Sequence, residues 1–267
     1  MQAWKNSYVD HPAGVTDYIR FGSGERTLVM IPGLGDGLAT VRGKALPFSL
    51  LYRSLARDFT VYVFSRRREL VPGMTTRDMA EDLYCAMDAL CIRNAAVLGV
   101  SQGGMIAQWL CLDHPEKVRR LVLAVTAARP NPTLEEVVTG WLEMARRGDF
   151  KAILEDTAEK SYSEKRLRSA RTENALAALL TRPRSLERFA IQAQSCLSHD
   201  AFDLLGGIAC PTLIIGGRED KIVTGQASRE MALRIDGSQI YMYDGLGHGL
   251  YEEAPDFLGR VSDFCKR

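Results

Sequence analysis

The chain has 267 residues, of which 46% are hydrophobic and 25% are charged, and its formal net charge is +1. This length allows one large α/β domain with an inserted subdomain, and the composition is typical of a globular protein. The balanced charge gives no electrostatic reason to expect nucleic acid or an anionic membrane as a partner, and we expect neither.

The sequence carries no sign of export or of a metal centre. Residues 1–10 lack the apolar core of a signal peptide, and no run of about 18 apolar residues occurs, so we expect a cytoplasmic protein. The six cysteines have neither a C-x-x-C pair nor metal-ligand spacing, which favours buried reduced thiols over a catalytic cysteine or a structural zinc. We expect no metal and no cofactor.

The first part of the chain predicts a sheet with antiparallel strands at its edge. Residues 7–9 and 16–21 have the pattern of two such edge strands. The apolar run Thr27–Ile31 predicts a strand that is buried on both faces, and the Gly-rich loop 32–37 follows it. This loop matches neither G-x-G-x-x-G nor G-x-x-x-x-G-K-S, which argues against a nucleotide site.

Three consecutive arginines follow the next predicted strand, Phe59–Phe64, after a helix predicted over residues 47–58. We expect Arg66, Arg67 and Arg68 to lie on a solvated loop. The alternative is a cationic rim, from which Arg66 binds an anionic substrate. Further along, Thr75 and Asp78 predict a capping box at the start of a helix.

Residues 95–115 predict a short buried strand, an abrupt turn and a helix, with Ser101 at the turn. The frame Gly-Val-Ser-Gln-Gly at 99–103 is the G-x-S-x-G pattern of a nucleophile elbow. Such a turn forces its central residue into a strained conformation, and the glycines avoid clashes with the opposing chain. We interpret Ser101 as a nucleophile. The alternative is a structural turn that happens to contain a serine.

A sixth strand, predicted over residues 120–126, completes an alternation of strands and helices that indicates a mostly parallel sheet covered on both faces. Residues 130–205 then contain four helical patterns and no strand candidate, the first of them capped by Thr133 and Glu136. We interpret this segment as a helical lid rather than an independent domain, because no Gly/Ser linker bounds it. The core would comprise residues 1–129 and 206–267.

A serine nucleophile needs a base and an orienting acid. Among four histidines, we choose His248, which follows the last predicted strand in the glycine-lined sequence Gly-Leu-Gly-His-Gly. Ligands bind at the carboxyl edge of open α/β sheets, where this loop would lie. Asp220 comes shortly after another strand and is the predicted acid, with Glu219 as its alternative. The backbone N–H groups of Gln102 and Leu34 are the predicted donors to an oxyanion.

In these motifs the chain resembles the α/β-hydrolase superfamily, and the resemblance covers nearly everything outside the predicted lid. It implies the α/β-hydrolase fold and the chain order Ser101, Asp220, His248. The segments that carry it are Ile-Pro-Gly-Leu-Gly at 31–35, Gly-Val-Ser-Gln-Gly-Gly-Met-Ile-Ala-Gln at 99–108, Pro-Thr-Leu-Ile-Ile-Gly-Gly-Arg-Glu-Asp at 211–220 and Gly-His-Gly at 247–249.

Two features depart from patterns common in the superfamily. Pro32 stands where many members have a histidine, and Ser65-Arg66 stands where many have an Asp- and Gly-rich turn. A serine at the elbow, in place of aspartate, argues against the haloalkane dehalogenase branch. The resemblance specifies substrate poorly, since the superfamily includes esterases, lactonases such as enol-lactonase-like enzymes, C–C bond hydrolases, acyltransferases and ligand receptors.

We therefore predict a cofactor-free serine hydrolase that cleaves a small ester, lactone or thioester through an acyl-Ser101 intermediate. Acyl transfer or C–C bond cleavage on the same residues is an alternative, as is a receptor that binds a small ligand with little turnover. The partner would be a small-molecule acyl substrate. Trp141 lies on an apolar helix face that either packs within the lid or contacts this substrate. The sequence leaves the oligomeric state open.

Overall fold

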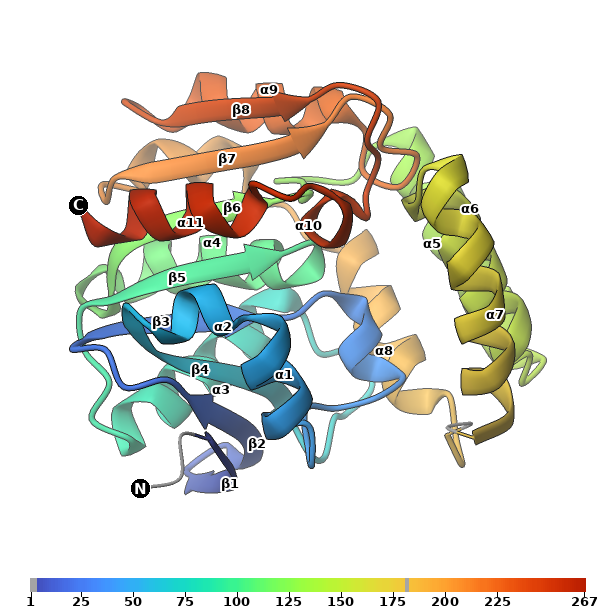
Figure 1. Cartoon of the computed structure of the whole chain (residues 1–267), viewed down its shortest axis with the longest axis horizontal. Coiled ribbons are helices and arrows are strands. Elements are labelled where there is room, and N and C mark those ends of the chain that lie inside the picture. The colour runs from blue at the N-terminus through green and yellow to red at the C-terminus, as the bar shows by residue number, and fades with distance from the viewer. Residues whose placement is uncertain (1–3, 181–182) are drawn as a thin grey trace.

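An eight-stranded sheet runs through the computed structural model, which describes residues 4–180 and 183–267 (Figure 1). Its order is β1-β2-β4-β3-β5-β6-β7-β8. β1 pairs antiparallel with β2, and β2 with β4, whereas all other neighbours are parallel. The strands are β1 (Trp4–His11), β2 (Gly14–Phe21), β3 (Arg26–Ile31), β4 (Phe59–Arg67), β5 (Ala95–Val100), β6 (Val118–Ala124), β7 (Thr212–Gly217) and β8 (Gln239–Tyr243). The predicted mostly parallel sheet with an antiparallel edge is confirmed.

Helices cover both faces of this sheet, which explains why its central strands are continuous apolar runs. In Figure 1, α1, α2 and α11 lie in front of the sheet, and α3, α4 and α9 lie behind it. These helices are α1 (Ala45–Leu51), α2 (Arg53–Ala56), α3 (Thr76–Ala89), α4 (Gln102–Asp113), α9 (Gly225–Arg234) and α11 (Phe257–Lys266), with the short α10 (Leu250–Glu253) before α11. Three 3₁₀ turns complete this part: η1 (Leu34–Gly37), η2 (Pro115–Lys117) and η3 (Phe202–Gly207).

Four more helices lie between β6 and β7 in the chain: α5 (Pro132–Arg146), α6 (Phe150–Ser161), α7 (Glu164–Leu180) and α8 (Glu187–Leu197). Figure 1 shows them on the side to which the carboxyl ends of β5, β7 and β8 point. The expected helical segment is thus present after the sixth strand, although residues 181–182 lie outside the described part. Its role as a lid and its limits at residues 130 and 205 remain predictions.

Local signals in the sequence predict one helix start correctly and another incorrectly. Thr75 and Asp78 form the predicted capping box of α3. The predicted cap Thr133 is wrong, because α5 begins at Pro132 and Asn131 accepts the hydrogen bond of the Leu134 amide at 3.0 Å. The helix predicted over residues 47–58 is divided into α1 and α2 at Tyr52.

The expected loop of three arginines is also wrong, because β4 continues through Arg67. Arg66 is buried, with 5% of its surface exposed. The Arg67 guanidinium donates to the carbonyl of Ala13 at 2.9 Å. Arg68 is exposed and binds the Asp17 carboxylate through two nitrogens, at 2.7 and 3.1 Å. Each side chain has its own protein partners, so the three do not form a solvated cluster.

In the part of the chain that the structure describes, no helix combines the length and the apolar character needed to cross a membrane.

Candidate active site

Ser101 occupies the turn between β5 and α4 in a conformation that amino acids with side chains rarely adopt. Its φ is 54° and its ψ is −123°. The turn brings α4 so close to the loop after β3 that a Cβ on Gly103 would lie 2.0 Å from the carbonyl oxygen of Ile31. Only glycine permits this approach. The glycine pattern around Ser101 therefore has the steric cause that the sequence suggested.

The structure brings His248 and Asp220 to Ser101 in one hydrogen-bonded chain. His248 follows β8, and its Nε2 lies 2.9 Å from Ser101 Oγ. Its Nδ1 lies 2.8 Å from Oδ2 of Asp220, which follows β7. The serine is partly exposed, whereas the histidine and the aspartate are buried. In this arrangement the imidazole is placed to accept the proton of the serine hydroxyl.

Asp220 is held as a charged carboxylate in a buried position. Its Oδ1 accepts the backbone N–H groups of Ile222 at 2.8 Å and Val223 at 3.0 Å. Burial by itself raises the pKa of Asp220, but His248 and these hydrogen bonds outweigh it, so the pKa lies below its ordinary value. Both carboxylate oxygens are thus fixed: Oδ1 by the backbone of the loop after β7, and Oδ2 by the imidazole of His248 after β8.

The two predicted oxyanion donors lie on the two segments that approach Ser101. Gln102 is the first residue of α4, where backbone N–H groups have no partner within the helix. Leu34 opens the η1 turn, directly after Gly33. A Cβ on Gly33 would lie 3.1 Å from Ser101 Cβ, which shows how closely this loop passes the serine. Both amides therefore belong to segments that border the serine hydroxyl.

Ser101 and His248 open into a cavity of about 820 Å³ between the sheet edge and the helical insert. This volume is at the upper end of the range for small-molecule sites. Most side chains on its wall are apolar or aromatic, among them Leu38, Phe48, Trp141, Phe189, Ile222 and Leu258. Charged groups on the wall are Asp36, Lys44, Arg166 and Glu252.

Trp141 of α5 packs within the helical insert and also borders the cavity, and its contact with a substrate remains a prediction. It is 5% exposed and packs within the apolar cluster of the insert, yet it also lines the cavity. Its indole Nε1 donates to Asp156 Oδ2 at 2.7 Å, which fixes the ring against α6.

Arg66 does not line this cavity, so the structure does not place its guanidinium as a rim around the substrate. It lies under the turn instead. Its Nη2 donates to the carbonyl oxygen of Pro32 at 2.6 Å and to Gln102 Oε1 at 2.8 Å. Burial lowers the pKa of Arg66 to about 10, so the side chain is still charged at neutral pH.

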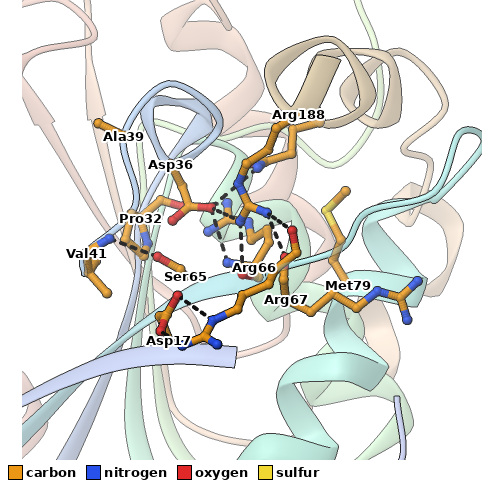
Figure 2. A network of polar contacts seen from close by, with 12 residues as sticks. Asp17, Pro32, Asp36, Ala39, Val41, Ser65, Arg66, Arg67, Met79 and Arg188 are labelled. Carbon is orange, nitrogen blue, oxygen red and sulfur yellow. Dashed lines mark hydrogen bonds and ion pairs between the residues drawn. The ribbon is translucent and has the colours of Figure 1, made fainter. Parts of the chain in front are cut away.

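A buried carboxylate that the sequence analysis missed balances this charge. Asp36 Oδ2 accepts the backbone N–H of Arg66 at 3.1 Å, a guanidinium nitrogen of Arg188 at 2.9 Å and Gln192 Nε2 at 3.3 Å (Figure 2). Burial alone raises the pKa of Asp36, but Arg66 and Arg188 outweigh it and lower the pKa. An acidic residue inside a Gly-rich loop was the only signal for this site, and its partners on α8 lie more than 150 positions away.

The three remaining histidines lie away from this cavity. His11, His114 and His199 do not line the cavity that contains Ser101. In the described residues, no cluster of three or more His, Cys, Asp or Glu side chains is arranged to hold a metal ion.

The chain is similar to known proteins in sequence and in fold. The family model described as the alpha/beta hydrolase fold matches residues 26–255. A 2-hydroxymuconate semialdehyde hydrolase of Pseudomonas sp. (strain CF600) is 29% identical over 266 residues, covering 94% of this chain and 91% of that protein.

Two solved structures share the fold. MGS-M2, an alpha/beta hydrolase enzyme from a Medee basin deep-sea metagenome library, has a TM-score of 0.86 at 20% identity, covering 98% of each chain. The enol-lactonase of Burkholderia xenovorans LB400 has a TM-score of 0.84 at 22% identity, covering 98% of this chain and all of that chain (100%).

Proposed function

The chain belongs to the α/β-hydrolase family and is an enzyme of the hydrolase type, and we propose that it cleaves a small ester, lactone or thioester through an acyl-serine intermediate. The observation that carries this proposal is the hydrogen-bonded chain Ser101–His248–Asp220 at the wall of the cavity.

In the proposed first step, Ser101 Oγ attacks the substrate carbonyl while His248 Nε2 takes its proton. Asp220 keeps Nδ1 protonated, so that Nε2 is free to act as the base. The backbone N–H groups of Leu34 and Gln102 stabilise the negative oxygen of the tetrahedral intermediate. His248 then returns the proton to the leaving alcohol, thiol or ring oxygen, and the acyl group remains on Ser101.

In the second step, water attacks the acyl-serine and gives one proton to His248, which passes it back to Ser101 Oγ as the carboxylic acid leaves. The distance of 2.9 Å between His248 Nε2 and Ser101 Oγ suits the proton transfers, and the contact with Asp220 holds the imidazole in place during both steps.

The chemistry of the cavity wall favours a substrate with an apolar acyl or alcohol part. Phe48, Phe189 and Leu258 line the cavity from three different helices, α1, α8 and α11. Trp141 would contact the same part of the substrate from α5. Its fixed ring supports a role in choosing substrates by shape.

A fluorophosphonate probe tests the nucleophile directly. We expect it to label Ser101 and no other residue. A Ser161→Ala variant should be labelled as well as the wild type, because Ser161 also lines the cavity but is not part of the hydrogen-bonded chain with His248. With p-nitrophenyl esters of increasing chain length, Ser101→Ala and His248→Ala should each lower kcat by about 10⁵–10⁶-fold. Labelling elsewhere, or full turnover by Ser101→Ala, would falsify the proposal.

A second candidate is the hydrolysis of a C–C bond next to a carbonyl on the same residues. The similarity to a 2-hydroxymuconate semialdehyde hydrolase over almost the whole chain favours it. Product analysis distinguishes the two candidate functions. The purified protein is incubated with esters, lactones and thioesters and, in parallel, with semialdehyde-type substrates. Adding alcohols and amines as acceptors to the same reactions reveals acyl transfer, since the acyl product then changes with the acceptor.

A further inference from the structure

One nitrogen atom of Arg66 joins the two segments that carry the proposed oxyanion donors. Nη2 donates to the carbonyl oxygen of Pro32, two residues before Leu34, and to the side chain of Gln102. Gln102 is buried and contributes its own backbone N–H to the proposed oxyanion hole. The guanidinium therefore binds one donor-bearing residue directly and the other through the short loop before it.

Further hydrogen bonds fix the Gln102 side chain and the Arg66 backbone. The amide nitrogen of the Gln102 side chain donates to the Gln192 carbonyl at 2.7 Å and to Ser195 Oγ at 3.1 Å, so its orientation is determined from α8 as well. The backbone of Arg66 is held by Asp36, which lies in the same η1 turn as Leu34. The loop after β3, strand β4 and the N-terminus of α4 are thus connected through one buried side chain. Figure 2 shows Arg66 beside Pro32 and Asp36 of that loop.

Stability alone does not explain an arginine at this position. Its Nε and Nη1 are buried and have no hydrogen-bond partner among the described residues. Burying a charge with incomplete partners is costly, and an apolar side chain of similar volume is often equal or better for folding. The two hydrogen bonds that the Arg66 side chain does make both go to the segments that carry the proposed oxyanion donors.

We propose that Arg66 is a positioning residue for the oxyanion hole, holding the Leu34 and Gln102 amides at the separation that the tetrahedral intermediate requires. This rests on the proposed serine hydrolase function. Displacement of a preorganised donor by about 1 Å is enough to lower a rate by about 100-fold. The effect should fall on the transition state and leave substrate binding in the apolar cavity almost unchanged.

The test compares Arg66→Met with Arg67→Met, a neighbour in β4 that loses hydrogen bonds to Ala13 and Glu69 but contacts neither oxyanion segment. Both are assayed on the best p-nitrophenyl ester and with an aryl trifluoromethyl ketone, which forms a tetrahedral adduct with a nucleophilic serine. For Arg66→Met we expect kcat to fall about 10- to 100-fold and the ketone Ki to rise by the same factor, with KM within about twofold. Arg67→Met should keep both values near those of the wild type.

A conservative variant provides a rescue. Because a single nitrogen of Arg66 makes both bonds, a lysine ammonium has enough donors to replace it, so Arg66→Lys should recover part of kcat and of the ketone affinity. Should Arg66→Met fail to fold, Arg66→Lys and Arg67→Lys carry the same comparison.

The outcomes separate this role from the function on which it rests. Equal kcat and Ki in the folded Arg66 and Arg67 variants, or a change in KM alone, overturns the positioning role. Turnover that survives in Ser101→Ala refutes the serine hydrolase function itself. Dependence on Ser101 without dependence on Arg66 refutes the positioning role only.

Discussion

The carboxylate of Asp220 meets the imidazole of His248 through one oxygen only, at 2.8 Å, while its other oxygen is bound by two backbone amides. This division of partners prevents the carboxylate from rotating. Since Nδ1 of His248 must donate to Asp220, Nε2 is left as the acceptor that faces Ser101. The tautomer that a serine nucleophile requires is therefore determined by the loop after β7.

Replacing Asp220 by asparagine should remove this control. The amide nitrogen of the substituted side chain would favour the opposite tautomer of His248, so we expect kcat to fall by about 10⁴-fold while the fold is retained. Glu219→Gln is the matched control, because the Glu219 side chain is exposed. Its backbone N–H donates to the carbonyl oxygen of Leu246, and the substitution keeps this bond. Steady-state kinetics with a p-nitrophenyl ester measures both variants, and comparable activity in the two would contradict the assignment of Asp220.

Ser101, His248 and Asp220 could be predicted because each is determined mainly by its own short segment of the chain. A Cβ on Gly99 would lie 2.5 Å from the carbonyl oxygen of Gly103 within the same turn, and His248 and Asp220 each follow their strand in a short loop. Such constraints leave a pattern that can be read without knowing the fold. The capping box at Thr75 and Asp78 was predictable for the same reason.

The buried contacts of Arg66, Asp36 and Arg188 could not be predicted, because they join segments that are far apart in the sequence. Three consecutive arginines are ordinarily solvated, and nothing near Arg66 in the sequence indicates that Pro32 and Gln102 lie beside it. Asp36 and Arg188 are 152 positions apart. Their pairing depends on how α8 packs against the η1 turn, and this packing has no sequence period of its own.

The buried His199 should make the protein less stable in mild acid. Burial lowers the pKa of His199 from 6.5 to about 3 in the folded protein. Between these two pKa values the unfolded chain binds a proton at His199 that the folded chain does not bind. The contribution of His199 to the free energy of unfolding is therefore complete above pH 6.5 and is lost as the pH falls toward 3. We expect the free energy of unfolding to decrease by up to about 1.4 kcal/mol per pH unit in this window from this residue.

Denaturant unfolding at several pH values, with wild type and His199→Gln, measures that contribution. The variant is less stable near neutral pH, because it disturbs the hydrogen bonds of the ring with Thr76 and Trp109, but its dependence on pH should be flatter. Parallel pH profiles for the two proteins would show that His199 does not titrate as described.

Trp141 should influence which substrates are accepted. We expect Trp141→Leu to shift relative kcat/KM toward longer or bulkier acyl groups by about tenfold, because the cavity gains volume next to the apolar wall. Leu142→Ala is the control: Leu142 is its buried neighbour on α5 and does not line the described cavity. That variant should lower Tm and leave the substrate ranking unchanged. An identical ranking in both variants would limit Trp141 to packing.

The contact between Arg188 and Asp36 should contribute strongly to stability. Arg188 also donates to the carbonyl oxygens of residues 66–68, so that one side chain attaches α8 to the end of β4. The Asp36 side chain is fully buried, whereas Arg188 is 20% exposed. Loss of the arginine leaves a buried carboxylate with fewer partners and three carbonyls without this donor. We expect Arg188→Gln to lower the free energy of unfolding by about 2–4 kcal/mol.

A double-mutant cycle with Asp36→Asn isolates the pair. Because the two side chains are in direct contact, the double variant should lose less than the sum of the single losses, by about 1 kcal/mol or more. Arg171→Gln is the comparison on the same insert, since Arg171 and Glu159 form an exposed pair at 3.3 Å, and it should cost less than about 1 kcal/mol. Additive losses for Arg188 and Asp36 would mean that α8 is held by its apolar contacts, with the ion pair contributing nothing specific.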